Sequence, residues 1–428
     1  MELPNVWPGG RTMGTGDMPL SGRFVSIPAR DLQFGMFVAE LDRPWLETPF
    51  LVQGFIVSEP EQRKLLMELC NKVTIDTGKS QQGSAARKSR KVSGREAILR
   101  ETPGKRLGIY KDTRSFDQEI VSATEMYESY ESTVKSFYED FRRNKAINLK
   151  DVNNTVDNLV ESIVRNPDAC MLLRQMRRKS DYLHDHAMGM SIWSAALGRQ
   201  LGLPPEDIKH LAFGALVADA GTVHISNDLL NKPAKLTESE FKYVQRHVDK
   251  SLEILGQTEG LDPKIIEIVQ SHHERFDGSG YPQGLIGNQI PIFARIVSIA
   301  DCYDAVTTKR PYAKPLTPSE GVTLLYGLRE KDFQSELVEE FIQAIGIYPV
   351  GTMVELTSGE VGTVIAEYRR RRLRPKILLL LDSEKRPIKS RQFVNLLKTT
   401  QCDDGTPLDI VRALEPGAYG LADDDIFA

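Results

Sequence analysis

Cysteine is scarce in this chain, and the four residues present lie far apart. Cys70, Cys170, Cys302 and Cys402 form no CxxC pair within the 428 residues, so neither a zinc knuckle nor a disulfide framework is expected. There is no run of about 18 uncharged apolar residues, and the N-terminal stretch MELPNVWPGGRTMG has no apolar core. We therefore expect neither a membrane span nor a signal peptide, and a cytoplasmic location.

An excess of positive charge is also missing. The 55 Lys and Arg residues and the 59 Asp and Glu residues give a net charge of −4, which disfavours nucleic-acid binding by bulk phosphate neutralisation. A basic run at residues 369–372 has no interleaved aromatic residues, so a charged hairpin tip explains it better than a nucleic-acid contact. With 40% hydrophobic and 27% charged residues, the chain can bury the cores of two or three domains.

Changes of pattern along the chain predict a multi-domain protein that is mainly helical. Short β-rich runs come first, a polar low-complexity stretch follows, and helical periodicity with capping signals then gives way to a period of two. The expected parts are a flexible N-terminus (1–20), a small α+β domain (21–77), a linker (78–115), a helical domain (116–346), a small antiparallel β element (347–400) and a tail (401–428).

One predicted helix carries a single apolar stripe, formed by Tyr127, Tyr130, Val134, Phe137 and Phe141. The alternating spacing of three and four residues places these side chains on one helix face. We expect this face to pack on its own domain. A seam between two copies of the chain in a homodimer is the alternative.

Histidine is confined to one region, because all seven histidines lie between residues 184 and 273. A lone histidine on a helix is usually structural, but imidazoles from several helices of one bundle can converge on a metal. The adjacent His272 and His273 would point about 100° apart in the middle of a helix. They stand at a predicted helix end just before glycines, where backbone freedom can turn both rings inward.

Two aspartates complete the candidate metal site. Asp219 and Asp301 each end an apolar helical run, and an unpaired carboxylate there would be costly to bury. A carboxylate can balance the charge of a cation and can bridge two ions. An aspartate that caps a neighbouring helix is the structural alternative.

The segment of residues 272–312, HHERFDGSGYPQGLIGNQIPIFARIVSIADCYDAVTTKRPY, resembles the signature of the HD-GYP phosphodiesterases, bacterial enzymes that hydrolyse cyclic di-GMP. Upstream, YLHDHAMGM and LLNKPAKLTESEFKYVQRHV match the histidine-bearing helices of that family. Residues 24–77 are similar to a domain of unknown function that often precedes these modules. The resemblance implies a helical bundle of the HD type as the main domain.

The same resemblance implies a binuclear metal site. One ion would be held by His186, Asp219 and Asp301, and Asp219 would bridge to a second ion held by His247, His272 and His273. Imidazole and carboxylate ligands together suit Fe or Mn, with Zn, Mg or Ni as alternatives, and one or two ions per chain are expected.

The motif that names the family is altered in this chain. Where relatives have His-Asp-x-Gly-Lys, residues 218–222 read ADAGT, so Ala218 cannot act as a ligand and Thr222 cannot supply the charge of the lysine. His224 is considered as a substitute donor. Tyr182 stands where some relatives have a glutamate ligand for a third metal, so three ions are not expected.

The resemblance assigns catalysis to Asp219 and Arg310, and substrate contacts to Gly280, Tyr281, Pro282, Arg310 and Lys314. Disturbing the partners of metal ligands typically lowers affinity or activity about 10–100-fold. We therefore expect a cyclic di-GMP phosphodiesterase, producing pGpG or GMP, whose turnover is weakened or lost. One alternative is an inactive regulatory protein that binds cyclic di-GMP or, through the loop around Gly280-Tyr281-Pro282 (the GYP loop), a diguanylate cyclase (GGDEF) domain. Another alternative is an HD hydrolase that acts on a different nucleotide.

Overall fold

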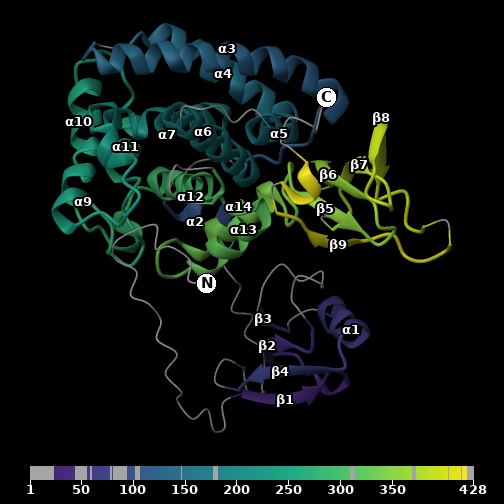
Figure 1. Cartoon of the computed structure of the whole chain (residues 1–428). Helices are drawn as coiled ribbons and strands as arrows, with labels where there is room; N and C mark the ends of the chain where they lie inside the picture. Colours follow the sequence, from purple (N-terminus) through teal and green to yellow (C-terminus); the bar gives the residue numbers. More distant parts are fainter. Residues whose placement is uncertain are drawn as a thin grey trace. The chain divides into compact units, whose positions relative to one another are not determined.

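The computed structural model divides into two compact units, one within residues 11–91 and the other within residues 92–428 (Figure 1). Each unit is described by itself. The residues that the structure describes are 24–43, 55–57, 60–77, 80, 94–101, 107–145, 147–176, 182–308, 314–368, 373–402, 404–415 and 417–421.

The first unit is a four-stranded antiparallel sheet with one α-helix, which confirms the predicted α+β domain. Its elements are β1 (Phe24–Pro28), the 3-10 helix η1 (Ala29–Asp31), β2 (Phe37–Leu41), β3 (Phe55–Ile56), α1 (Pro60–Leu69) and β4 (Lys72–Asp76). The strand order is β1-β4-β2-β3. Leu32, Val38, Leu66 and Val73 are fully or almost fully buried and form its core with Ile75.

The second unit is mainly helical, as predicted. Its α-helices are α2 (Gly94–Glu101), α3 (Phe116–Arg142), α4 (Leu149–Arg165), α5 (Pro167–Met176), α6 (Tyr182–Leu201), α7 (Pro205–Ala218), α8 (Asn227–Leu230), α9 (Glu238–Gln245), α10 (His247–Leu255), α11 (Pro263–Ser271), α12 (Ile292–Thr307), α13 (Pro318–Gly327) and α14 (Ser335–Ile345), with the 3-10 helices η3 (Ala220–His224) and η4 (Gly287–Gln289). Helix α6 is buried over most of its length and packs against α7, α12 and α14.

The helix starts follow the capping signals of the sequence. Thr237 and Thr317 each accept a hydrogen bond from the backbone N–H three residues later and form complete capping boxes. Asp262 caps α11, which has Pro263 at its first position. These local signals fix where α9, α11 and α13 begin.

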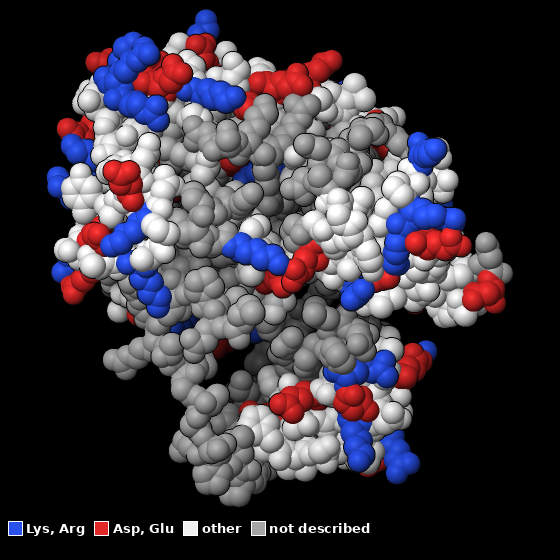
Figure 2. Space-filling model, in the orientation of Figure 1, with Lys and Arg blue, Asp and Glu red and all other residues white. Residues whose placement is uncertain are grey.

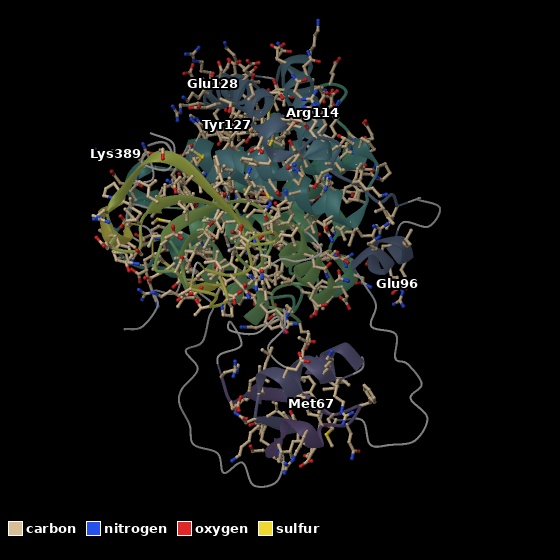
Figure 3. The ribbon with its side chains drawn as sticks, turned by 90° about the vertical axis from the view of Figure 1, so that its right-hand side faces the viewer. Met67, Glu96, Arg114, Tyr127, Glu128 and Lys389 are labelled. Carbon is tan, nitrogen blue, oxygen red and sulfur yellow. The ribbon has the colours of Figure 1, made fainter. Side chains whose placement is uncertain are left out.

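The apolar stripe of α3 is buried inside this chain. Tyr130, Val134 and Phe141 are completely buried, and α3 packs on α4, α5 and α6. Tyr127 lies on this inner face, whereas its neighbour Glu128 is exposed on the outer side of the helix (Figure 3). The stripe therefore packs on its own domain, and the seam between two copies is not what buries it.

Two of the expected boundaries need correction. The expected linker over 78–115 contains α2, because Ile98 is completely buried in the main core and α2 packs on α14. The expected tail over 401–428 contains β9 (Ile410–Ala413), which pairs with β5. Both segments are short, and only their tertiary partners make them regular.

The C-terminal elements form a five-stranded antiparallel sheet. The strands are β5 (Met353–Leu356), β6 (Val361–Ala366), β7 (Lys376–Leu381), β8 (Pro387–Asn395) and β9, followed by η5 (Ala418–Gly420). Their order is β8-β7-β6-β5-β9, so Lys389 lies on an edge strand (Figure 3). The basic run at 369–372, between β6 and β7, lies outside the described residues.

Charges of both signs are interspersed over the described part of the face shown in Figure 2, in keeping with the small net charge. None of the helices in the described part of the chain combines the length and the apolar character needed to cross a bilayer.

Candidate metal centre

Asp219 lies where α7 ends, and α10 fixes its position. It is the C-cap residue of α7, and η3 begins directly after it. The Ser251 hydroxyl donates to the carbonyl oxygen of Ala218 (3.0 Å) and accepts from the Gly221 N–H (2.8 Å). A Cβ at position 221 would lie 2.2 Å from the carbonyl oxygen of His247, so glycine is needed for this close approach. The turn that carries Asp219 is thus clamped to the helix that carries His247.

The rings of His247 and His272 are oriented by the same kind of hydrogen bond. In each, Nδ1 contacts the carbonyl oxygen three residues earlier, which belongs to Val244 at 2.8 Å and to Val269 at 2.9 Å. A carbonyl oxygen only accepts, so Nδ1 donates and Nε2 is left as the ligand atom. The carbonyl groups in the last turn of a helix have no partner within the helix. The end of α9 and the end of α11 therefore each set one imidazole tautomer.

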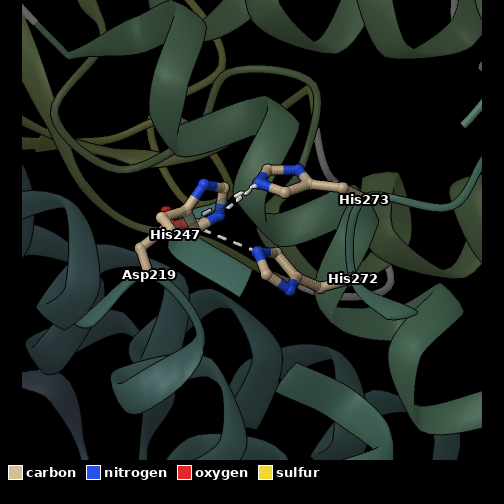
Figure 4. Close-up of side chains that lie close together, drawn as sticks. All are labelled: Asp219, His247, His272 and His273. Atoms are coloured by element: carbon tan, nitrogen blue, oxygen red, sulfur yellow. Dashed lines mark hydrogen bonds and ion pairs between the residues drawn. The ribbon is translucent and has the colours of Figure 1, made fainter. Parts of the chain in front are cut away.

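The Nε2 atoms of three histidines surround Oδ1 of Asp219 (Figure 4). Those of His247, His272 and His273 lie 3.0, 3.4 and 3.6 Å from it. Four ligand atoms placed tetrahedrally about 2.1 Å from an ion are about 3.4 Å apart. The ligand atoms of this four-residue group all lie within 4.8 Å of one another, so the donor set and its spacing fit a metal ion.

Burial and mutual charge interactions shift the pKa values of this group in both directions. Burial alone would raise the pKa of Asp219, but hydrogen bonds from the surrounding histidines hold it well below its usual range. Burial and the charge of His272 lower the pKa of His273 to about 3. Burial would also lower the pKa of His247, but its hydrogen bond and charge interaction with Asp219 raise it. A proton therefore competes more strongly with a metal ion at His247 than it would at an ordinary histidine.

A second group of three residues shares Asp219. His186 Nε2 lies 3.2 Å from Oδ1 of Asp301 and 3.5 Å from Oδ2 of Asp219, and the ligand atoms of these residues also lie within 4.8 Å of one another. The other oxygen of Asp301 is buried and accepts no hydrogen bond within the described part of the chain. Burying such an oxygen is costly unless a cation faces it.

The structure thus brings the six predicted ligands together in two groups, the four-ligand group (Asp219, His247, His272 and His273) and the three-ligand group (His186, Asp219 and Asp301). Ala218 is completely buried and adds no donor. His224 belongs to neither group among the described residues, so it does not replace the missing imidazole. The Tyr182 ring stacks on that of His186, with centroids 5.3 Å apart.

The GYP loop lies directly against the four-ligand group. The Tyr281 ring is 4.7 Å from that of His273 and 5.9 Å from that of Phe241 on α9, and the Tyr281–Pro282 peptide bond is cis. A Cβ on Gly280 would lie 2.3–2.5 Å from backbone atoms of residues 273–275. Only glycine lets the loop fold back this closely on the chain that carries the ligand.

Of the two predicted phosphate-binding cations, the structure describes one. Arg310 belongs to residues that the structure does not describe. Lys314 is exposed, and its Nζ lies 2.5 Å from Oε2 of Glu415. Its role toward substrate stays a prediction.

Three supporting residues were not singled out in the sequence. Ser251 clamps the turn of Asp219, as described above. The buried Glu274 accepts hydrogen bonds from the N–H groups of Gln283 (2.7 Å) and Leu285 (3.0 Å) in the GYP loop. Asp304 contacts His186 Nδ1 at 2.8 Å. Its position three residues after Asp301 on one helix was the available signal, because residues at i and i+3 share a face.

Comparisons with known proteins identify similar domains and relatives. A family model described as "HD domain" matches residues 159–336. A second model, described as "Domain of unknown function (DUF3391)", matches residues 25–152 and so extends beyond the small α+β unit. A cyclic di-GMP phosphodiesterase of Pseudomonas aeruginosa is 30% identical over 379 residues, which are 88% of this chain and 90% of the relative.

Two other relatives match a shorter stretch. A cyclic di-GMP phosphodiesterase response regulator of Xanthomonas campestris is 36% identical over 36% of this chain and 41% of its own length. A 3'3'-cGAMP-specific phosphodiesterase of Vibrio cholerae is 36% identical over 37% of this chain and 36% of its own length.

Proposed function

This chain belongs to the HD-GYP family of HD domain proteins, and from that premise we propose that it is a metal-dependent phosphodiesterase of cyclic di-GMP. The substrate is the one named for the relative that is similar over most of the chain. The products expected from hydrolysis of one or both phosphodiester bonds are pGpG and GMP.

The observation that carries this proposal is the position of Asp219 between two groups of ligands. Its Oδ1 faces three imidazoles, and its Oδ2 faces His186. A carboxylate with one oxygen in each group can bridge two divalent ions, and paired ions lower the pKa of water and relieve charge on phosphoryl oxygens. Mixed imidazole and carboxylate ligands suit Fe or Mn, with Zn, Mg or Ni as alternatives.

Other residues of the chain would bind and orient the dinucleotide. Tyr281, held in place through Gly280 and Glu274, borders the four-ligand group on the side of His273. Lys314 is exposed, and its ammonium group, with the guanidinium of Arg310, would face the phosphates as a cation.

The two ion positions are unequal, which supports reduced turnover. The four-ligand group offers three imidazoles and a carboxylate, whereas the three-ligand group lacks a donor at Ala218. We expect one ion to bind tightly and a second to bind more weakly. Thr222 also leaves the phosphate without a lysine, so the catalytic rate falls further.

The same missing donor favours a regulatory protein as the second candidate. Such a protein would bind cyclic di-GMP, or a diguanylate cyclase domain through the GYP loop, without hydrolysing the nucleotide. A homodimer and a cytoplasmic location also remain predictions.

Elemental analysis combined with product chromatography tests the proposal. The full chain is loaded with excess Mn²⁺ or Fe²⁺ and incubated with cyclic di-GMP or, in parallel, 3'3'-cGAMP. Metal-dependent release of pGpG or GMP is expected, and it should vanish in Asp219→Asn but persist in the control Asp228→Asn, which changes an exposed aspartate on α8. Tight metal binding without any product would leave the regulatory function instead. Faster hydrolysis of 3'3'-cGAMP would reassign the substrate.

A further inference from the structure

Asp304 on α12 is a buried carboxylate whose two oxygens are both engaged. Oδ1 accepts from Arg174 Nε and from Trp193 Nε1, each at 3.0 Å. Oδ2 accepts from Arg174 Nη2 (2.9 Å) and from the Thr308 hydroxyl (3.2 Å). Asp304 and Arg174 are only 1% exposed, so this bidentate ion pair has a fixed geometry.

One further contact connects this carboxylate to the candidate metal centre. Oδ2 of Asp304 lies 2.8 Å from Nδ1 of His186. A carboxylate that is already paired with a guanidinium accepts hydrogen bonds, so Nδ1 of the imidazole is the donor. The opposite nitrogen, Nε2, then faces Asp301 and Asp219 and is the atom that can bind a metal ion once it has lost its proton.

Helix α6 leaves room for this arrangement at Gly189, three residues after His186. A Cβ at Gly189 would lie 1.9 Å from Oδ1 of Asp304 and 2.4 Å from Nε of Arg174. His186, Gly189 and Trp193 share one face of α6, and all three face Asp304. Glycine is therefore needed at position 189, where the Arg174–Asp304 ion pair lies against the backbone of α6.

We propose that Asp304, held by Arg174 and Trp193, is the positioning residue that fixes the tautomer and orientation of His186 for metal binding. Such partners of ligating imidazoles raise the basicity of the ligand, and their loss typically lowers metal affinity about 10–100-fold. The role matters most in the three-ligand group, where His186 is the only imidazole among the described residues. This inference rests on the proposed metal-dependent function.

A purely structural ion pair between α5 and α12 would have a different consequence. It would hold the helices together but leave metal affinity unchanged whenever the fold is intact. Asp304→Asn alone would leave the guanidinium of Arg174 buried without its counter-charge and could unfold the chain. The double variant Arg174→Gln/Asp304→Asn removes both charges, with asparagine matching aspartate in size and glutamine shorter than arginine.

Titration calorimetry of the full chain with Mn²⁺ separates these roles. Wild type should bind two ions, and His272→Asn identifies the tighter one by removing a ligand of the four-ligand group. In the folded double variant, the weaker ion should lose about 10–100-fold in affinity, while the tighter ion is retained. The matched control Glu119→Gln/Arg165→Gln removes another carboxylate–guanidinium pair, between the buried Glu119 on α3 and the partly exposed Arg165 on α4, and should lower the melting temperature without changing either affinity.

Each other outcome is decisive. Unchanged affinity for both ions in the folded double variant would overturn the role of Asp304 and leave the proposed function standing. Wild type that binds only one ion at millimolar Mn²⁺, with that ion lost in His272→Asn, would also overturn it, because His186 would then hold no metal. Wild type that binds no ion at all would overturn the proposed function itself.

Discussion

The Nε2 atoms of His247 and His273 lie 3.2 Å apart in the core of the helical unit. The Nδ1 atom of His247 already donates to a backbone carbonyl, so neutral His247 accepts at Nε2 and a proton on Nε2 of His273 makes this a hydrogen bond. A metal ion held by both rings needs both lone pairs, so this proton has to leave when the ion binds. Metal ions and protons therefore compete for the same place.

The stabilisation of the folded chain by bound metal should increase with pH. Burial would lower the pKa of His186 and of His247, but the charges and hydrogen bonds around them raise both values in the folded chain. In the metal-free chain these groups contribute stability below about pH 6.5, and that stability is lost as pH rises through the raised pKa values. Bound metal displaces these protons, so affinity should rise about tenfold per pH unit for each proton displaced.

Melting temperatures with and without 1 mM Mn²⁺, measured between about pH 5.5 and pH 8.5, check this. The shift caused by Mn²⁺ should grow across that range and shrink toward its acid end. A shift that does not change with pH would contradict the competition.

Removing one imidazole from the four-ligand group should abolish the tight metal. His272 is completely buried, and its Nε2 faces Asp219, so His272→Asn should lose at least about 10–100-fold in affinity. Elemental analysis after dialysis gives the metal content, and circular dichroism verifies the fold. His210→Asn is the matched control, because this buried histidine pairs with Asp262 and belongs to neither ligand group. Full metal content in His272→Asn would refute the assignment.

Restoring the altered motif should raise turnover. Ala218→His returns a donor to the turn that carries Asp219, and Thr222→Lys returns a cation for the phosphate. The double variant should hydrolyse cyclic di-GMP at least about tenfold faster than wild type. Product chromatography of the two single variants and the double variant separates the contributions. No gain in any of them would show that the loss of activity extends beyond this motif.

The GYP loop should loosen when Glu274 loses its charge. The Glu274 carboxylate accepts two backbone N–H groups of the loop, and in Glu274→Gln one of them would face an amide N–H₂ group. An unsatisfied buried donor costs about 1–3 kcal/mol, so hydrogen exchange at Gln283 and Leu285 should become roughly tenfold faster or more. Glu267→Gln, on the exposed face of α11, removes the same charge and should leave that exchange unchanged.

Local signals in the sequence were enough to predict much of this fold and site. Capping boxes at Thr237 and Thr317 set helix starts, because their partners lie within one turn. The clustered histidines pointed to the site, and the structure places two of them, His247 and His272, at helix ends where backbone carbonyls orient the rings.

What the sequence could not predict depends on distant partners. Helix α2 is regular because it packs on α14, and β9 exists because β5 pairs with it. The connection from Asp304 to Arg174 and His186 joins three helices, so no spacing along the chain reveals it. The sequence showed that residue 218 lacks a donor side chain. Only the structure could show that Ala218 is buried and that His224 belongs to neither ligand group.

His273 and Glu274 are consecutive residues, yet one faces the four-ligand group and the other anchors the GYP loop. Because one peptide bond joins the two residues, a displacement of the exposed loop would move Glu274 and, with it, the imidazole of His273. A partner that binds the GYP loop would therefore shift the geometry of the metal ligands. Conversely, a metal ion bound by the four-ligand group would make the loop more rigid.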